Sequence, residues 1–317
     1  MVKNYFVILF IFLTIIFVVN AHFIASDPKS EYEIYLFFDN ANPLSQESEK
    51  FRINILNPVS GLPIETLDKG HESILHVFIV RNDLDFFDHM RVEDFADGLE
   101  NSIWGSYTFN YTFPMAGKYA IAVSYTPHGI TFLNLENASI AGKETLAAPN
   151  YDFALEKNFD GYDITLKHPK YLEAEKEHEF NYYIRKNGVE ISDLQLYLGS
   201  EINLFVIKDD LSSADLAHSY VPKETNDSEG AMQLYYGPTV PVHLIFKTPG
   251  KYVLFGEFKH DGKVIKTKFM VDVKPKITNL MNSAYNYYAY VNYVYIILIL
   301  VAAAISYIIW RRMGKPL

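Results

Sequence analysis

Apolar and polar residues alternate with a period of two along most of this chain, which is the spacing of β-strands that bury one face. The alternation is clear in residues 51–55, 107–113 and 119–125. Residues 76–80 and 203–207 are nearly continuous apolar runs, as expected of central strands in a sandwich. Proline, glycine and aspartate punctuate these runs with turn chemistry. The pattern predicts an all-β fold built from immunoglobulin-like β-sandwiches.

The middle of the chain repeats itself. Residues 75–84 (LHVFIVRNDL) reappear as residues 202–211 (INLFVIKDDL), and Gly-Lys-Tyr at 117–119 reappears at 250–252. At an offset of 127 positions, an ungapped stretch of 34 positions contains eight identities. The identical pairs are Asn54 and Asn181, Gly61 and Gly188, Ile64 and Ile191, Leu67 and Leu194, Ser73 and Ser200, Phe78 and Phe205, Asp83 and Asp210, and Leu84 and Leu211. The chain therefore contains two copies of one domain.

These patterns divide the exported part of the chain into two tandem sandwiches. We predict the first over residues 28–140 and the second over residues 151–275, each close to the ~100 residues of an immunoglobulin-like domain. Residues 141–150 are small and polar and are expected to form the linker, and residues 276–288 a stalk. Because the linker is short, we expect the two sandwiches to sit end to end with limited freedom.

An apolar segment lies at each end of the chain. Residues 1–21 are typical of a secretory signal peptide, with Lys3 before a 14-residue apolar core and small residues before the cleavage point. Retention as an uncleaved signal anchor is the alternative, because apolar residues resume after the cleavage point. Residues 289–310 predict a single transmembrane helix, and the basic residues of the 311–317 tail place it in the cytoplasm. The expected location is the cell membrane, with both sandwiches extracytoplasmic and the bilayer as a partner.

Composition excludes several classes of chemistry. The chain has no cysteine, which rules out disulfides, thiol catalysis, cysteine-ligated zinc and iron–sulfur clusters. All 38 acidic residues lie between Ala21 and Tyr285, where only 24 basic residues stand against them. Such an acidic surface repels phosphate backbones, so we expect no nucleic-acid partner.

The repeat unit carries a recognisable order of motifs: G-x-x-I-x-x-L, an apolar strand that ends in Asp-Leu, a nearby histidine and a Gly-Lys-Tyr strand. It resembles the Ig-like or FixH/CopC-like β-sandwich modules of exported prokaryotic membrane-anchored proteins. In those modules a strand that begins with His leads into D-L-x-x-F-x-H-x-H-P. The first copy keeps His76 and His89, but Met-Arg stands where the second His and the Pro would follow. The second copy has Asn203 in the first position and places His218 two residues late. The resemblance implies copper handling for some relatives, and the missing histidines count against it here.

Histidine is the main candidate for metal ligation. His76 and His89 are positioned to approach each other across a turn, and cleavage after residue 21 would make His22 the mature N-terminus. An N-terminal His chelates copper through its amine and Nδ1, and other imidazoles complete the site. The alternative, which we favour, is that each histidine makes ordinary hydrogen bonds. Weaker candidate sets are His218, His243 and His260 for a metal ion, and Asp160, Asp163, Asp209 and Asp210 for calcium.

Catalytic motifs are missing from the sequence. It contains no G-x-S-x-G, P-loop or Rossmann glycine pattern, and the H-E-x-x-x-H at residues 71–76 is one residue longer than the zincin motif. The repeated residues have structural interpretations: Asp as a turn residue that accepts backbone N–H bonds, the following Leu as a buried plug, and the Tyr of Gly-Lys-Tyr as a corner tyrosine. A repeat that keeps such positions while its histidines differ favours a scaffold.

We therefore predict a non-enzymatic, membrane-anchored recognition or accessory protein with a protein or glycan partner outside the cell. An extracytoplasmic copper-binding protein that uses His22, His76 and His89 is the alternative, and no other cofactor is expected. Asn110, Asn137 and Asn226 stand in N-x-S/T sequons and are candidate glycosylation sites.

Overall fold

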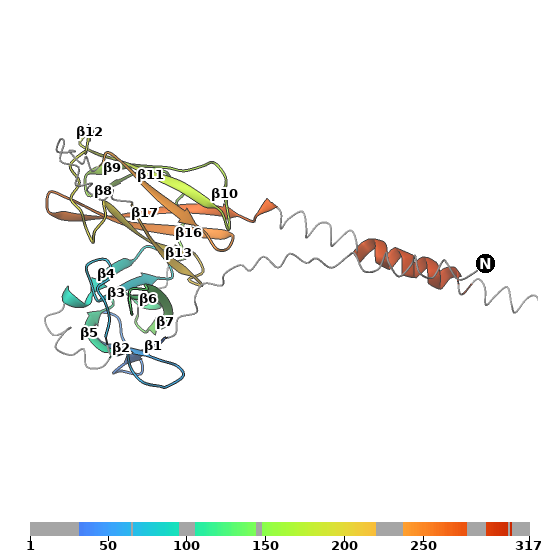
Figure 1. Cartoon of the computed structure of the whole chain (residues 1–317), viewed down its shortest axis with the longest axis horizontal. Helices are drawn as coiled ribbons and strands as arrows, with labels where there is room; N and C mark the ends of the chain where they lie inside the picture. Colours follow the sequence, from blue (N-terminus) through green and yellow to red (C-terminus); the bar gives the residue numbers. More distant parts are fainter. Residues whose placement is uncertain are drawn as a thin grey trace, which may run out of the picture.

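The structure is a computed structural model that describes residues 32–64, 66–94, 105–143, 148–219, 237–277, 290–303 and 305. Each of the two repeats folds into a sandwich of two β-sheets, and the two sandwiches lie against each other (Figure 1). The mostly β architecture of packed sheets predicted from the sequence is confirmed.

The first sandwich packs a sheet of order β1-β2-β5 on a sheet of order β4-β3-β6-β7. All pairings within these two sheets are antiparallel. A 3-10 turn at Val92–Asp94 follows β4. The strands are β1 (Glu33–Phe38), β2 (Ser48–Leu56), β3 (Leu75–Arg81), β4 (Phe87–Arg91), β5 (Ser106–Thr112), β6 (Gly117–Tyr125) and β7 (Phe132–Ile140).

The second sandwich repeats this arrangement with additions. One sheet has the order β12-β11-β9-β8 with β15 also paired to β11, and the other has the order β10-β17-β16-β13-β14. Strands β9, β11, β13, β14, β15, β16 and β17 take the places of β1, β2, β3, β4, β5, β6 and β7. The bounds are β8 (Glu156–Phe159), β9 (Tyr162–Lys167), β10 (Leu172–Glu173), β11 (Glu177–Lys186), β12 (Val189–Glu190), β13 (Ile202–Lys208), β14 (Ala214–His218), β15 (Thr239–Ile245), β16 (Gly250–His260) and β17 (Lys263–Lys274).

The predicted period of two matches the burial of alternate side chains in β2 and β11. Phe51, Ile53 and Ile55 of β2 are fully buried and alternate with more exposed neighbours. Phe180 and Tyr182 of β11 occupy the equivalent places in the second core and are also fully buried. Burial of alternate apolar side chains against the second sheet is what stabilises each sandwich.

The repeated Asp-Leu pair closes the turn after β3 and after β13. Asp83 Oδ1 accepts the backbone N–H of Asp85 at 3.1 Å, and Asp210 Oδ1 accepts that of Ser212 at 3.0 Å. Leu84 and Leu211 both adopt a left-handed backbone, with φ of 65° and 60°, and both are buried. Leucine rarely adopts this conformation, so burial of the side chain offsets a local backbone cost. The predicted turn and plug roles are confirmed.

The Gly-Lys-Tyr motif forms equivalent corners in the two sandwiches. Tyr119 donates its hydroxyl hydrogen to the backbone carbonyl of Met115 at 2.6 Å, and Tyr252 does the same to that of Thr248 at 2.8 Å. Each tyrosine thus fixes the chain four residues upstream, as a corner tyrosine does. This confirms the structural interpretation of the motif.

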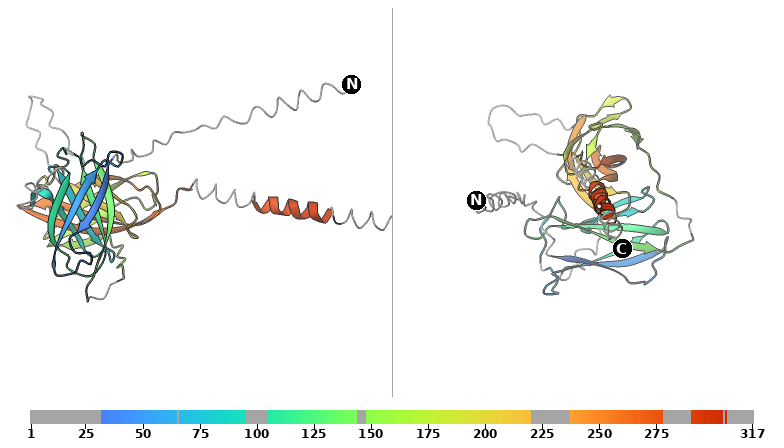
Figure 2. Two further views of the ribbon diagram at one scale, coloured as in Figure 1. Left: turned by 90° about the horizontal axis from the view of Figure 1, so that it is seen from below. Right: turned by 90° about the vertical axis from the view of Figure 1, so that its right-hand side faces the viewer.

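The two sandwiches do not sit end to end, so that expectation was wrong. The sheet β4-β3-β6-β7 stacks face to face on the sheet that contains β13, β14, β16 and β17 (Figures 1 and 2). A separate apolar cluster joins them, and its buried members are Phe78, Val80, Leu84, Ala120, Ala122, Phe205, Ile207, Leu211, Val253, Phe255 and Met270. In β3 and β6, the side chains that point toward the other sandwich are apolar, as are those that point into the core of their own sandwich. This explains why the apolar runs of these strands are continuous in sequence.

A helix covers residues 290–303 in the described part of the chain and lies apart from the sandwiches (Figure 2). Residues 1–31, which include the predicted signal peptide, and most of the predicted stalk and tail lie outside the described residues. Within the residues that the structure describes, no helix is both long and apolar enough to cross a membrane.

Candidate functional site: a polar network between the two sandwiches

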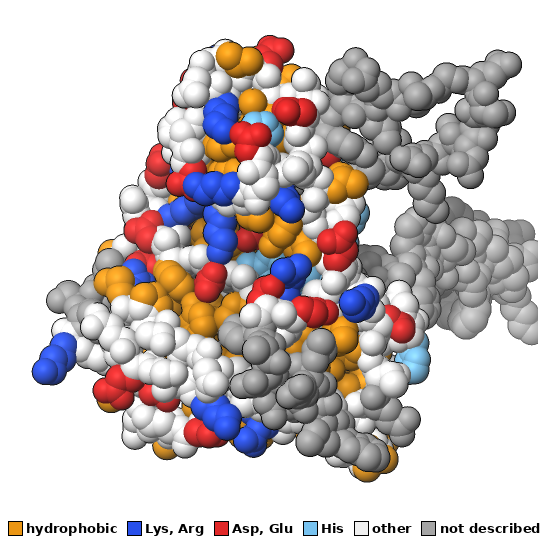
Figure 3. Space-filling view, turned by 90° about the vertical axis from the view of Figure 1, so that its left-hand side faces the viewer, with side chains coloured by type: hydrophobic (Ala, Val, Ile, Leu, Met, Phe, Trp, Pro, Cys, Tyr) orange, Lys and Arg blue, Asp and Glu red, His pale blue; other side chains and the backbone are white. Residues whose placement is uncertain are grey.

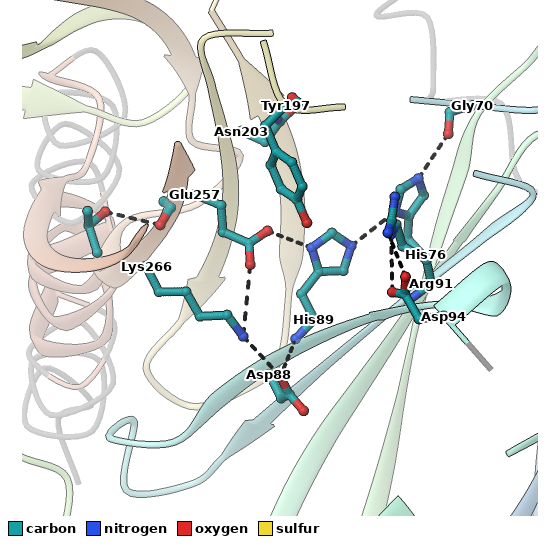
Figure 4. A network of polar contacts seen from close by, with 12 residues as sticks. Gly70, His76, Asp88, His89, Arg91, Asp94, Tyr197, Asn203, Glu257 and Lys266 are labelled. Atoms are coloured by element: carbon teal, nitrogen blue, oxygen red, sulfur yellow. Dashed lines mark hydrogen bonds and ion pairs between the residues drawn. The ribbon is translucent and has the colours of Figure 1, made fainter. Parts of the chain in front are cut away.

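A group of histidines lies among apolar side chains at the interface between the two inner sheets. We use this name for the two sheets that face each other, β4-β3-β6-β7 and β10-β17-β16-β13-β14. His76 of β3 and His89 of β4 come from the first sandwich, and Glu257 of β16 comes from the second (Figure 4). They line a cavity of about 30 Å³ together with Phe78, Phe87, Asn203, Phe205, Phe255 and other residues. A volume of this size is enough for one or two water molecules and too small for an organic substrate.

His76 holds the loop before β3. Its Nε2 lies 2.9 Å from the carbonyl oxygen of Gly70. Asn203, the equivalent residue of the second repeat, donates from Nδ2 to the carbonyl of Tyr197 at 2.6 Å, and Tyr197 is the counterpart of Gly70. Position 76 and position 203 therefore make the same side-chain-to-backbone bond with different side chains, and the second one needs no imidazole.

His89 connects the two sandwiches. Its Nε2 lies 3.0 Å from His76 Nδ1, and its Nδ1 lies 2.6 Å from Glu257 Oε2 (Figure 4). The side chains of His89 and Glu257 are only 2% and 5% exposed. The position of the histidine differs between the repeats here, because His89 pairs with Phe78 whereas His218 pairs with Asn203, two positions further along the ladder.

The hydrogen bonds fix where the protons lie. Burial, with His89 as the second cause, lowers the pKa of His76 to about 4, so this ring is neutral near pH 7. Its one N–H is on Nε2 and donates to Gly70, which leaves Nδ1 as an acceptor for the Nε2–H of His89. The close contact between His89 Nδ1 and Glu257 then holds one further proton. The His89–Glu257 pair as a whole is neutral, which is how two ionisable groups are tolerated at such depth.

Lysines of β17 complete the connection at the rim of the interface. Lys266 Nζ lies 2.9 Å from Asp88 and 3.9 Å from Glu257, and Lys268 Nζ lies 2.5 Å from Asp85. Figure 3 shows apolar side chains along the boundary between the upper and lower sandwiches, with charged side chains beside them. The pairs with Asp88 and Asp85 cross between the sandwiches, while the apolar cluster supplies most of the stabilisation.

His71 and His218 form a second pair near the same cavity. Their ring centroids are 5.0 Å apart and the ring planes are inclined by 61°. Burial first, and His218 second, lowers the pKa of His71, while a hydrogen bond to the backbone of Leu198 works in the opposite direction. Leu198 is the repeat counterpart of His71, and both residues have a left-handed backbone. The pair joins the loop before β3 to the edge strand β14.

The predicted metal ligands meet only in part. His76 and His89 do come together, but each of their ring nitrogens already faces a protein partner, so the pair does not present free lone pairs to copper. His22 lies outside the described residues. In the described part of the chain, no group of three or more His, Asp or Glu side chains is arranged to hold a metal ion.

The second histidine set does not converge. His243 is half exposed and lies 3.8 Å from Glu177, whereas His260 is buried and bonds Tyr162 at 2.8 Å. The suggestion that these two and His218 share one site is wrong. They stand on β15, β16 and β14 with separate partners.

The calcium candidates have ordinary partners. Asp160 pairs with Lys263 at 3.1 Å, Asp163 accepts from Asn158 at 2.9 Å, and Asp209 accepts from Tyr151 at 2.9 Å. Asp210 bonds its own turn, as described above. These contacts match solvated turn carboxylates and do not form a calcium cage.

The sequons lie on different parts of the surface. Asn110 of β5 and Asn137 of β7 have exposed side chains, and Asn226 lies outside the described residues. Glycosylation at these positions stays a prediction.

Sequence reasoning missed the residues that make the network cross the interface. Glu257 looks like one polar position in an exposed face of β16, yet it is 4% exposed. The usable signal was an acid inside the apolar run at residues 252–258, at a place where the first repeat has Ser124. A charge in a run that is apolar on both faces requires a partner from outside its own sheet.

The second sandwich matches a family model described as a domain of unknown function (DUF8832), over residues 157–275. No curated protein matches the chain. Among solved structures, the chain is similar to the Escherichia coli adhesin FdeC, with 10% identity over 78% of this chain and 66% of that one and a TM-score of 0.22.

Two further structures give similar values. Invasin, a bacterial integrin-binding protein, matches with 10% identity over 75% of this chain and 39% of invasin, and a TM-score of 0.21. Domains 4 and 5 of the S-layer protein SbsC match with 10% identity over 77% of this chain and 99% of that one, and a TM-score of 0.20. The chain thus spans less than two thirds of the adhesin and of invasin. None of the three is a FixH- or CopC-like protein, so that part of the resemblance stays a prediction.

Proposed function

We propose that this chain is a non-enzymatic recognition or accessory protein, anchored in the cell membrane by one C-terminal helix and exposing its paired sandwiches outside the cytoplasm. The observation that carries this is the face-to-face packing of the two inner sheets. It turns two repeats into one body whose outer sheets, loops and edges face solvent. Such a body suits the display of a fixed surface to a protein or glycan.

The membrane anchor rests on the chemistry of the C-terminal region. In the helix at residues 290–303, Ile296, Leu298 and Ile299 are exposed together with their apolar neighbours. An apolar helix without a protein partner for its side chains is suited to lipid. The sequence continues without a charge to Trp310 and then turns basic, which favours a cytoplasmic tail.

The absence of enzymatic activity is supported by the state of the buried polar groups. His76, His89 and Glu257 satisfy one another and the Gly70 carbonyl, and the space beside them holds only water-sized molecules. A catalytic group needs an available proton or lone pair that faces a substrate. These groups instead face each other across the interface.

Fractionation of cells that export the full-length chain tests the anchor. We expect the chain to stay in the membrane pellet after alkaline extraction, and a variant that ends at residue 277 to be secreted in soluble form. External protease should remove both sandwiches and spare an epitope placed after residue 317. Alkaline release of the full-length chain, or protection of the sandwiches, would refute the proposed topology. The secreted variant then serves to screen surface proteins and glycans for binding.

Copper binding is the second candidate, and the proximity of His76 to His89 favours it. It requires the hydrogen bonds of both rings to be given up and the mature chain to begin at His22. Copper titration of wild type against His76→Asn and His89→Gln tests it. Equal affinity in all three chains would dismiss a site at these residues.

A further inference from the structure

The His71–His218 pair has a geometry that the polar network does not use. In the described structure, neither residue takes part in the chain of bonds from Gly70 to Glu257. The two imidazoles come from different sandwiches and meet beside a solvent-open groove of about 440 Å³, which both of them line. His218 is exposed and His71 is half-buried.

Both rings are oriented by backbone carbonyls. His218 Nδ1 lies 3.0 Å from the carbonyl oxygen of Ser219, so it donates there and leaves Nε2 with its lone pair. His71 donates one N–H to the backbone of Leu198, which leaves its other nitrogen as an acceptor. A ligating histidine is usually held in this way, with its second nitrogen bonded to a carbonyl that sets the tautomer.

The ring separation fits two ligands on one ion. A Zn–N bond of about 2.0–2.1 Å places the centre of each imidazole about 3.2 Å from the metal, so two rings at the tetrahedral angle lie about 5.2 Å apart. The observed separation of the centroids is 5.0 Å. Two imidazoles stacked in parallel could not both point a nitrogen at one ion, but the planes of these rings are inclined by 61°.

We propose that His71 and His218 bind a divalent transition-metal ion that cross-links the two sandwiches at the edge of their interface. The two imidazoles supply two ligands, and water from the groove supplies the others. Imidazole is a ligand that suits zinc, copper and nickel over magnesium and calcium. This site shares no residue with the copper candidate, and it holds whether or not the chain is membrane-anchored.

The test is a zinc titration of the full-length chain, purified in detergent micelles without a polyhistidine tag. We expect one equivalent of Zn²⁺ to bind, and Co²⁺ to give the visible absorption of a four-coordinate site. His71→Asn keeps a residue that tolerates the left-handed backbone and can still donate to Leu198. His218→Gln changes an exposed position at the end of β14. Each variant should bind at least about tenfold more weakly, since loss of a ligand costs no less than loss of its supporting bond.

The controls separate this site from the other histidines. His243→Gln removes an exposed imidazole on β15 and should leave zinc affinity unchanged. Thermal unfolding should shift upward with zinc in wild type and His243→Gln but not in His71→Asn or His218→Gln. Zinc affinity that is unchanged in His218→Gln, or no binding to wild type at all, would overturn the proposal.

Discussion

Phe78 and Phe205 hold the same position in the two repeats and stack on each other across the domain interface, with centroids 4.7 Å apart and ring planes inclined by 9°. Leu84 and Leu211, another equivalent pair, join the same cluster. Contact between equivalent residues is typical of two copies that face each other through the same surface. Some of the identities between the repeats therefore serve the contact between the sandwiches as well as the core of each one.

Phe205→Ala is expected to destabilise the whole body. Phe205 is 2% exposed and packs against side chains of both sandwiches, so its removal should lower the free energy of unfolding by about 3–5 kcal/mol. Chemical denaturation followed by tyrosine fluorescence measures the change. Phe37→Ala is the matched control, because Phe37 is half exposed on β1 and should cost under about 1 kcal/mol. Equal effects of the two variants would contradict a shared apolar interface.

The continuous apolar runs indicated a contact surface that the core of a single sandwich does not account for. Residues 76–80 and 203–207 were correctly predicted as central strands of sandwiches, because period and turn chemistry are local signals. Their second apolar face showed that another surface must cover them, and the repeat itself was the covering surface. The end-to-end arrangement was wrong because linker length limits the distance between domains but does not choose which faces meet.

The candidate site was predictable only in part, for the same reason. His76 and His89 could be paired because they lie on adjacent strands of one hairpin. Glu257 and Lys266 could not be assigned to them, since strands of the other repeat bring these side chains in and no local pattern encodes that docking.

Asp83→Ala and Asp210→Ala compare one turn position in two environments. Arg81 forms a buried ion pair with Asp83 and, despite burial of the carboxyl, the guanidinium helps to hold the pKa of Asp83 below its ordinary value. Loss of Asp83 leaves a buried arginine without its counter-charge and should cost about 3–5 kcal/mol. Lys208 and Asp210 lie 3.6 Å apart at an exposed turn, where the loss should stay near about 1 kcal/mol. Urea unfolding of both variants gives the comparison, and a larger loss for Asp210→Ala would disprove it.

Glu257→Ala is expected to disturb the interface more than its size suggests. Alanine offers no partner to His89 Nδ1, so the buried imidazole loses its hydrogen bond at that nitrogen. We expect a loss of about 3 kcal/mol or more in unfolding free energy. The exposed Glu177, beside His243, is the matched control, and Glu177→Ala should change it by less than about 1 kcal/mol. If calorimetry gives both variants the same stability, the buried network does not hold the interface.

Stability should fall as the pH drops from 6.5 toward 4, and His76 should account for a defined share of this. The folded-state pKa of His76 is about 4 against 6.5 in an unfolded chain, because burial, and then His89, disfavour the charged ring. Between these values the unfolded chain binds a proton that the folded chain does not, so protonation favours unfolding and the full contribution returns above pH 6.5. A shift of this size corresponds to about 3 kcal/mol.

His76→Asn isolates this contribution. Asparagine stands at the equivalent position 203 and bonds the equivalent carbonyl, so the variant can keep the bond to Gly70 without a titrating group. The free energy of unfolding, measured at steps between pH 4 and pH 7, should fall less steeply in the variant than in wild type. The two curves should run parallel above pH 6.5, where the ring is neutral in both states. Parallel curves over the whole range would mean that His76 titrates normally and is not held neutral between the sandwiches.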